Sequence, residues 1–198
     1  TGVQTWALPI LKPVTAKNGK QTITGKIEAW GEIGLAVKAY DYMDNTTNIY
    51  GVKDITLRQD SQIIYHSNLD RFAFDETRYL NSYVDYEEWK ERRSFYMRSF
   101  VEPGNRLRFN ESINRGIIHI EEEKTYHLTY TLADAFGNTT RLSVWIEGKE
   151  QEISEIETEG TELFHWMADN RFGAKGIRMT IPKGNLYDDL YFRYSVKE

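Results

Sequence analysis

The sequence contains no cysteine among its 198 residues. Disulfides, zinc sites built from thiolates and Cys nucleophiles are therefore excluded. Positive charge is also scarce, because 25 Lys and Arg stand against 30 Asp and Glu and give a net charge of −5. A nucleic-acid-binding domain needs clustered Lys and Arg to neutralise phosphates, so we do not expect nucleic acid as a partner. No apolar run approaches the roughly 18 residues of a membrane span, and no signal peptide is visible.

Aromatic residues, in contrast, are abundant. They make up 14% of the chain, with 13 Tyr and 5 Trp, and the hydrophobic content of 40% is sufficient for a substantial core. Aromatic side chains are enriched in β-strands. The length allows one or two domains, and the composition predicts a mainly β protein.

Alternating hydrophobicity predicts several short strands. Apolar positions in residues 33–39 and 126–132 alternate with polar or small ones, which is the period-two pattern of half-buried strands. Residues 52–57 and 62–66 are expected to form a hairpin around a turn at 59–61. The other expected strands are 95–100, 106–109 and 142–146, with turns at 103–105 and 136–138. Short strands with turns at such intervals indicate a β-sandwich.

One segment departs from the β pattern. Asp85 lies three residues before Glu88, which is the spacing of a capping box with Asp in place of Ser or Thr. Acidic residues follow in the first turn, and Lys90 and Arg92 stand near the end, where they complement the helix dipole. The sequence therefore predicts a partly helical insertion over about 76–93. A helix this short is marginal in water, so we expect Trp89 to anchor it by packing on the sandwich or on the loop 70–74.

Residues 148–160 are rich in Glu and poor in apolar residues, and we interpret them as an acidic linker. Strand-like segments follow at 163–167, 177–181 and 190–196. This stretch is much shorter than the roughly 100 residues of a sandwich. We therefore expect 161–198 to be the start of a second β domain, truncated in this sequence.

Histidine is the first residue type to test for chemistry. We interpret His66, His119 and His127 as surface or hydrogen-bonded residues in three different expected strands. His165 and Asp169 have an H-x-x-x-D spacing that some zinc ligands use, but a zinc site needs a third protein ligand, and no H-x-H or H-E-x-x-H occurs. In a strand these two residues would stand about 13 Å apart, too far to share one metal. We predict no catalytic, cofactor-binding or metal-binding residue in this chain.

Three other groups each admit two interpretations. Adjacent carboxylates would suit acid–base work on a glycoside, although most such pairs form a solvated face; the pairs are Glu87/Glu88 and Asp188/Asp189. An oxygen-rich loop would suit calcium, although turn chemistry explains it more simply; its residues are Asp41, Asp44, Asn45 and Asn48. An aromatic group would suit a glycan-stacking platform, although core packing is the commoner role; its residues are Trp30, Tyr40, Tyr42 and Tyr50.

Four long motifs together resemble one known family. They are AWGEIGLAVKAYDYMD at 29–44, DRFAFDETRYLNS at 70–82, RSFVEPGNR at 98–106 and IPKGNLYDDL at 181–190. This combination resembles the region downstream of the catalytic domain in envelope-associated peptidases of the M23 (lysostaphin-like) family. The segment YTLADAFGNTT at 130–140 is similar to a strand-turn element of bacterial immunoglobulin-like modules. The resemblance extends from about residue 25 to the end.

The resemblance implies an immunoglobulin-like β-sandwich over 25–147 that carries the helical insertion. Members of the family are zinc endopeptidases that cut peptidoglycan cross-bridges with an H-x(n)-D pair and a later H-x-H. That set is missing here, so the resemblance implies a non-catalytic accessory module, with zinc only in a catalytic domain outside this sequence. The implied partners are that catalytic domain and peptidoglycan or another envelope glycan, in an extracytoplasmic location. The alternative is a free-standing envelope adhesin or glycan-binding module of the same fold.

The first ten residues, TGVQTWALPI, resemble the translation of a common sequencing adaptor, with Trp6 where Cys is expected. We therefore expect residues 1–24 to be a non-native or disordered lead-in. Pro9 and Pro13 also argue against a central strand there.

Overall fold

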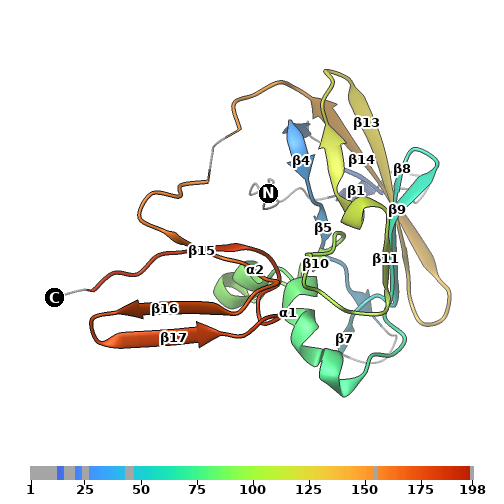
Figure 1. Cartoon of the computed structure of the whole chain (residues 1–198). Helices are drawn as coiled ribbons and strands as arrows, with labels where there is room; N and C mark the ends of the chain where they lie inside the picture. The colour runs from blue at the N-terminus through green and yellow to red at the C-terminus, as the bar shows by residue number, and fades with distance from the viewer. Residues whose placement is uncertain (1–12, 16–20, 24–26, 43–46, 154–155, 197–198) are drawn as a thin grey trace. The chain divides into compact units, whose positions relative to one another are not determined.

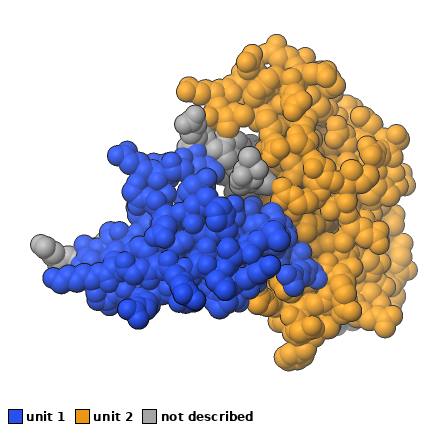
Figure 2. Space-filling model, in the orientation of Figure 1, with its two compact units in different colours: residues 1–2, 102–106, 154–198 blue, residues 3–101, 107–153 orange. Residues whose placement is uncertain are grey.

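The computed structural model describes residues 13–15, 21–23, 27–42, 47–153 and 156–196. Two compact units divide the chain (Figure 2). The sandwich unit comprises residues 3–101 and 107–153, and the C-terminal unit includes residues 102–106 and 154–198. Among the described residues, no helix is long and apolar enough to cross a bilayer.

The sandwich unit is built around one large sheet. Its strands in spatial order are β1 (Pro13–Thr15), β2 (Gln21–Ile23), β14 (Thr139–Gly148), β13 (Thr125–Ala133), β8 (Asp54–Gln59), β9 (Gln62–Asn68) and β11 (Asn110–Ser112), and β3 (Ile27–Ala29) also pairs with β14. Most neighbours are antiparallel, whereas β2 and β3 run parallel to β14. The expected lead-in lies largely outside the described residues, but its described parts form β1 and β2. Pro13 lies on the edge strand, where a missing amide is tolerated.

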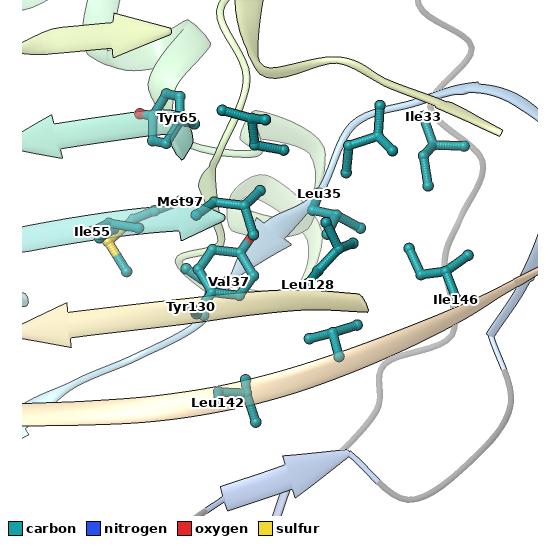
Figure 3. Close-up of a cluster of buried hydrophobic side chains, with 14 of the residues drawn as sticks. Ile33, Leu35, Val37, Ile55, Tyr65, Met97, Leu128, Tyr130, Leu142 and Ile146 are labelled. Carbon is teal, nitrogen blue, oxygen red and sulfur yellow. The ribbon is translucent and has the colours of Figure 1, made fainter. Parts of the chain in front are cut away.

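Shorter strand pairs also belong to this unit. They are β4 (Gly31–Ile33) with β12 (Ile118–Ile120), β5 (Ala36–Val37) with β10 (Met97–Arg98), and a hairpin of β6 (Asp41–Tyr42) with β7 (Ile49–Tyr50). Figure 3 shows Leu128, Tyr130 and Ile146 of the large sheet facing Leu35 and Val37 across the core. The expected mainly β, sandwich-like architecture is confirmed.

The connectivity has two hallmarks of immunoglobulin-like sandwiches. Strands β14, β13, β8 and β9 follow the order G-F-C-C′ of a variable-type sheet. Tyr126, near the start of β13, accepts hydrogen bonds at its hydroxyl from the backbone amides of Glu121 (3.3 Å) and Glu122 (3.2 Å). This arrangement is that of a tyrosine corner, which ties strand F to the chain just upstream.

Several expected strands are shorter in the structure or absent from it. The strand expected at 95–100 is reduced to β10 (Met97–Arg98), and the one expected at 190–196 ends at Phe192. The expected strand 33–39 is interrupted after Ile33, although Ile33, Leu35 and Val37 are all buried on one side as the alternation predicts. Residues 106–109 are not a strand, and the chain enters β11 only at Asn110. The reason is that the Arg108 backbone and guanidinium both bind Glu76, which holds this segment away from a ladder.

The helical insertion consists of η1 (Phe74–Tyr79), α1 (Leu80–Tyr83) and α2 (Tyr86–Arg92), visible as the coiled ribbons of Figure 1. Asp85 caps α2 as predicted and accepts from the Glu88 amide at 3.2 Å. The ring contacts of Trp89 are with Tyr86, Phe95 and the Arg93 guanidinium. Trp89 is half-buried within this local aromatic cluster, and its packing on the sandwich or on the loop 70–74 stays a prediction. Arg93 ends α2 in a left-handed conformation.

The C-terminal unit holds two separate hairpin-like sheets. Strand β15 (Glu162–Phe164) pairs with β18 (Leu190–Phe192), and β16 (Asn170–Ala174) pairs with β17 (Ile177–Ile181). Phe164 is buried, and its ring stacks on Phe192 at 5.0 Å between centroids. The strand expected at 163–167 ends at Phe164, since residues 165–168 form a turn that the Asn170 side chain holds through three hydrogen bonds.

Candidate functional site: the exposed face of the large sheet

The large sheet has a polar face directed away from the core. Along β13 the residues Tyr126, Leu128, Tyr130 and Leu132 are buried, so the side chains between them lie on the opposite side. The registers of β14, β8 and β9 extend the pattern across four strands. We call this surface the outer face; it comprises His127, Thr129, Thr131, Arg141, Ser143, Trp145, Thr56, Arg58 and His66.

An exposed indole is the most distinctive feature of the outer face. Trp145 is 48% exposed although it lies near the middle of β14, the longest strand. Its direct cross-strand neighbour is His127, and the two rings stack with centroids 4.1 Å apart. Because both rings stand on paired central strands, the indole is held in a fixed orientation.

A groove opens at the other end of the outer face. Its volume is about 420 Å³, and its lining combines hydroxyl, charged and apolar groups from β8, β9, β11 and the residue that follows β11. The lining residues are Thr56, Arg58, Ile63, Ile64, His66, Glu111, Ser112 and Ile113. Ile63 and Ile113 are exposed, so they offer apolar surface to a ligand.

Asp54 orients His66 by a hydrogen bond, and Glu111 lies on the other side of the ring. Its Nε2 lies 2.8 Å from Asp54 Oδ2, and its Nδ1 lies 3.8 Å from Glu111 Oε2. Asp54 also accepts from Thr56 and Asn68. The two ring nitrogens point in different directions, so these three groups do not converge on one position. Within the described residues, no three His, Asp or Glu side chains gather as metal ligands.

The two remaining histidines, His119 and His165, lie on different elements. His119 is exposed on β12 beside Asn114. His165 follows β15 in a turn rather than in a strand, which corrects the expectation, and its Nδ1 lies 3.3 Å from Asp189 rather than from Asp169. Asp169 instead accepts from the Lys183 amide at 2.8 Å. The H-x-x-x-D spacing is therefore part of a turn.

The carboxylate pairs have structural partners. Glu88 serves the helix cap and forms an i,i+4 ion pair with Arg92, while Glu87 is exposed in the first turn of α2. Asp189 accepts from the Trp166 amide at 3.1 Å and so connects β18 to the turn after β15. Asp188 accepts from the amide of Asp189 itself. These roles favour the structural interpretation of both pairs.

The expected aromatic platform is only partly exposed. Trp30 packs against the core and Tyr40 is half-buried, whereas Tyr42 and Tyr50 are exposed on the hairpin β6–β7. For the oxygen-rich loop, Asp44 and Asn45 lie outside the described residues. Asn48 donates to the Tyr50 hydroxyl at 3.3 Å. The structure thus places the exposed Trp on the outer face and not in this group.

A clamp fastens the helical insertion to the sandwich. The buried carboxylate of Glu76 accepts from the Arg108 guanidinium at 2.9 Å and from the amides of Ala73 (2.7 Å) and Arg108 (3.1 Å). Hydrogen bonds from Arg108 and from the Ala73 amide lower the pKa of Glu76 to about 2. The same pairing raises the pKa of Arg108.

No sequence motif marks the outer face as a site. The alternation expected along 126–132 puts His127 on the polar side of its strand, as the structure shows, whereas Trp145 stands in a strand pattern with no motif around it. The available signal was the set of residues alternating with the apolar positions of β13 and β14. That set includes Thr129, Thr131, Ser143, Arg141, Glu147, His127 and Trp145.

Residues 161–198, which contain β15 to β18, match the family model of a Zu5-like domain. Neither the comparison with curated proteins nor that with solved structures gave a match.

Proposed function

We propose that this chain is a non-catalytic accessory module of a cell-wall M23-type zinc endopeptidase. It positions the catalytic domain or its peptidoglycan substrate and works outside the cytoplasm. The zinc and the residues that cut cross-bridges belong to the catalytic domain of the parent protein.

The observation that carries this proposal is the structural role of the family-like motif at 70–82. Its Glu76 binds Arg108 and holds the helical insertion on the sandwich. The exposed residues of the same motif include Phe72 and Phe74, of which Phe74 is 97% exposed. The motif therefore combines an architectural anchor with an apolar contact surface, as a module that packs beside another domain requires.

The immunoglobulin-like strand order agrees with the same proposal. Such sandwiches serve many functions, so the fold alone does not select one. The outer face with Trp145 favours a second candidate, a free-standing glycan-binding module or adhesin. The two candidates differ in whether a catalytic domain is encoded next to this region.

The test begins with the coding sequence upstream of residue 25 and with the protein it encodes. We expect an H-x(n)-D motif and a later H-x-H there. Deleting residues 25–198 should slow muropeptide release from intact sacculi while leaving cleavage of small soluble cross-linked muropeptides unchanged, because only the insoluble substrate needs positioning. An upstream region without these motifs, or equal rates on sacculi with and without the module, would contradict the proposal.

A further inference from the structure

We infer that the outer face is a binding site for a linear glycan of N-acetylated hexosamine units. The inference deepens the proposed function, on which it rests, by naming the surface that contacts the substrate. It depends on three features: a fixed aromatic ring, rows of hydrogen-bonding side chains and a groove with apolar walls.

The first feature is the indole of Trp145. A pyranose ring has a flat face of C–H groups, and an exposed aromatic ring provides a matching apolar surface. Here the ring is held by stacking on His127, so little side-chain entropy is lost when a ligand covers it. The backbone groups of β13 are engaged with both neighbouring strands, so recognition on this face depends on side chains.

The second feature is the row of polar residues beside the indole. Thr129 lies directly between Ser143 on β14 and Arg58 on β8. The next row places Thr131 between Arg141 and Thr56. Hydroxyl side chains both donate and accept, and guanidinium groups donate several hydrogen bonds in a fixed plane. Together they suit the hydroxyl and acetamido groups along the edges of a sugar chain.

The third feature is the groove beyond Arg58. Its volume of about 420 Å³ lies within the range of small-ligand sites. The apolar side chains of Ile63 and Ile113 suit the methyl of an acetamido group. One guanidinium nitrogen of Arg58 donates to the Ser61 carbonyl at 3.0 Å, and the remaining N–H groups can donate to the acetamido carbonyl. From β14 to β9 there are three strand spacings of about 4.8 Å, or roughly 14 Å. The site is therefore extended and fits a short run of sugars across the strands rather than one monosaccharide.

Charge and geometry favour this ligand over other polymers. Arg58 and Arg141 share the outer face and its groove with the carboxylates of Asp54 and Glu111, so the site does not have the excess of positive charge that a phosphate polymer needs. A peptide adding to a sheet binds at an edge strand, whereas Trp145 and Thr129 stand on the face of paired strands. A largely neutral, hydroxyl-rich polymer satisfies both conditions.

The test titrates the full 198-residue chain with chitohexaose, a β-1,4 oligomer of N-acetylglucosamine, and with cellohexaose, which lacks the acetamido groups. We expect chitohexaose to shift the amide NMR signals of β13, β14 and β8. Trp145→Ala should weaken binding at least about tenfold, as truncation of a central aromatic anchor usually does. Arg58→Gln should reduce the preference for chitohexaose over cellohexaose.

The matched control is Phe136→Ala, which removes an exposed aromatic ring from the β13–β14 turn, away from the outer face, and should bind as the wild type does. Absence of shifts on these strands, or equal affinity of the Trp145→Ala variant with retained fold, would overturn the inference. Thr129→Val provides a second variant that keeps the side-chain shape. If the chain binds the sugar but deleting the module does not change muropeptide release from sacculi, only the proposed function is refuted. If deletion slows that release but the chain does not bind the sugar, only this site is refuted.

Discussion

At the residue scale, one tyrosine hydroxyl links a strand to the chain that precedes it. Tyr126 is buried, and its hydroxyl bonds the amides of Glu121 and Glu122. We expect Tyr126→Phe to lower the free energy of unfolding by about 0.5–1.5 kcal/mol, the usual contribution of such hydrogen bonds. Urea unfolding measures the loss. Tyr42→Phe, at an exposed position on β6, is the control and should leave the midpoint unchanged; equal losses in both variants would contradict the corner's role.

Two glycines allow the energetic cost of a left-handed backbone to be measured separately from the cost of steric crowding. Gly116 and Gly137 both have positive φ, +77° and +88°. A Cβ at Gly137 meets no atom within 4 Å, whereas one at Gly116 would stand 2.4 Å from the Ser99 carbonyl oxygen. Alanine at either site incurs the left-handed cost of about 1–2 kcal/mol.

At Gly116 the backbone must also move, so we expect Gly116→Ala to be more destabilising than Gly137→Ala by about 1–3 kcal/mol, the usual range for overpacking. Denaturant unfolding of both variants measures the difference. Similar losses of unfolding free energy in both variants would contradict this expectation, because they would show that the backbone around Ser99 moves at little cost.

At the element scale, the attachment of the helical insertion depends on pH. Glu76 keeps its charge in the folded state because Arg108 and the Ala73 amide lower its pKa to about 2, and in the unfolded chain it returns to about 4.5. A carboxyl with a lowered folded pKa stabilises the protein above its unfolded pKa. That stability is lost as pH falls from about 4.5 to about 2.

We therefore expect Glu76→Gln to be less stable than the wild type at pH 7 and to approach the wild type as pH falls through this window. Thermal unfolding between pH 7 and pH 2 gives the comparison. Glu123→Gln, at an exposed loop position, should follow the wild-type curve. Parallel curves for Glu76→Gln and wild type would show that the clamp does not contribute.

At the scale of the whole molecule, we predict that this chain holds no catalytic zinc. A catalytic zinc site needs three protein ligands and an open position for water. Three histidines lie on β9, β12 and β13, and His165 pairs with Asp189 in a turn. We expect metal analysis of the purified chain to find no stoichiometric zinc, and we expect no muropeptide release when zinc is added. Stoichiometric zinc that disappears in His165→Ala would contradict this prediction.

The features that the sequence predicted are those set by interactions between residues close together in the chain. Alternation placed Leu128 and Tyr130 in the core, and the spacing of Asp85 and Glu88 marked the start of α2. These features depend on residues only a few positions apart in the chain. They can therefore be predicted from the sequence alone.

Tertiary structure decided the rest. Arg108 ended up beside Glu76, 32 positions away, and this contact turned a predicted strand into a loop. The His165 ring lies beside Asp189 and not beside Asp169, because the Asn170 side chain holds residues 165–168 in a turn. The outer face exists only because registers between β14, β13, β8 and β9 bring Trp145 and Arg58 onto one surface. Such long-range contacts depend on chain closure and strand register, which no local pattern determines.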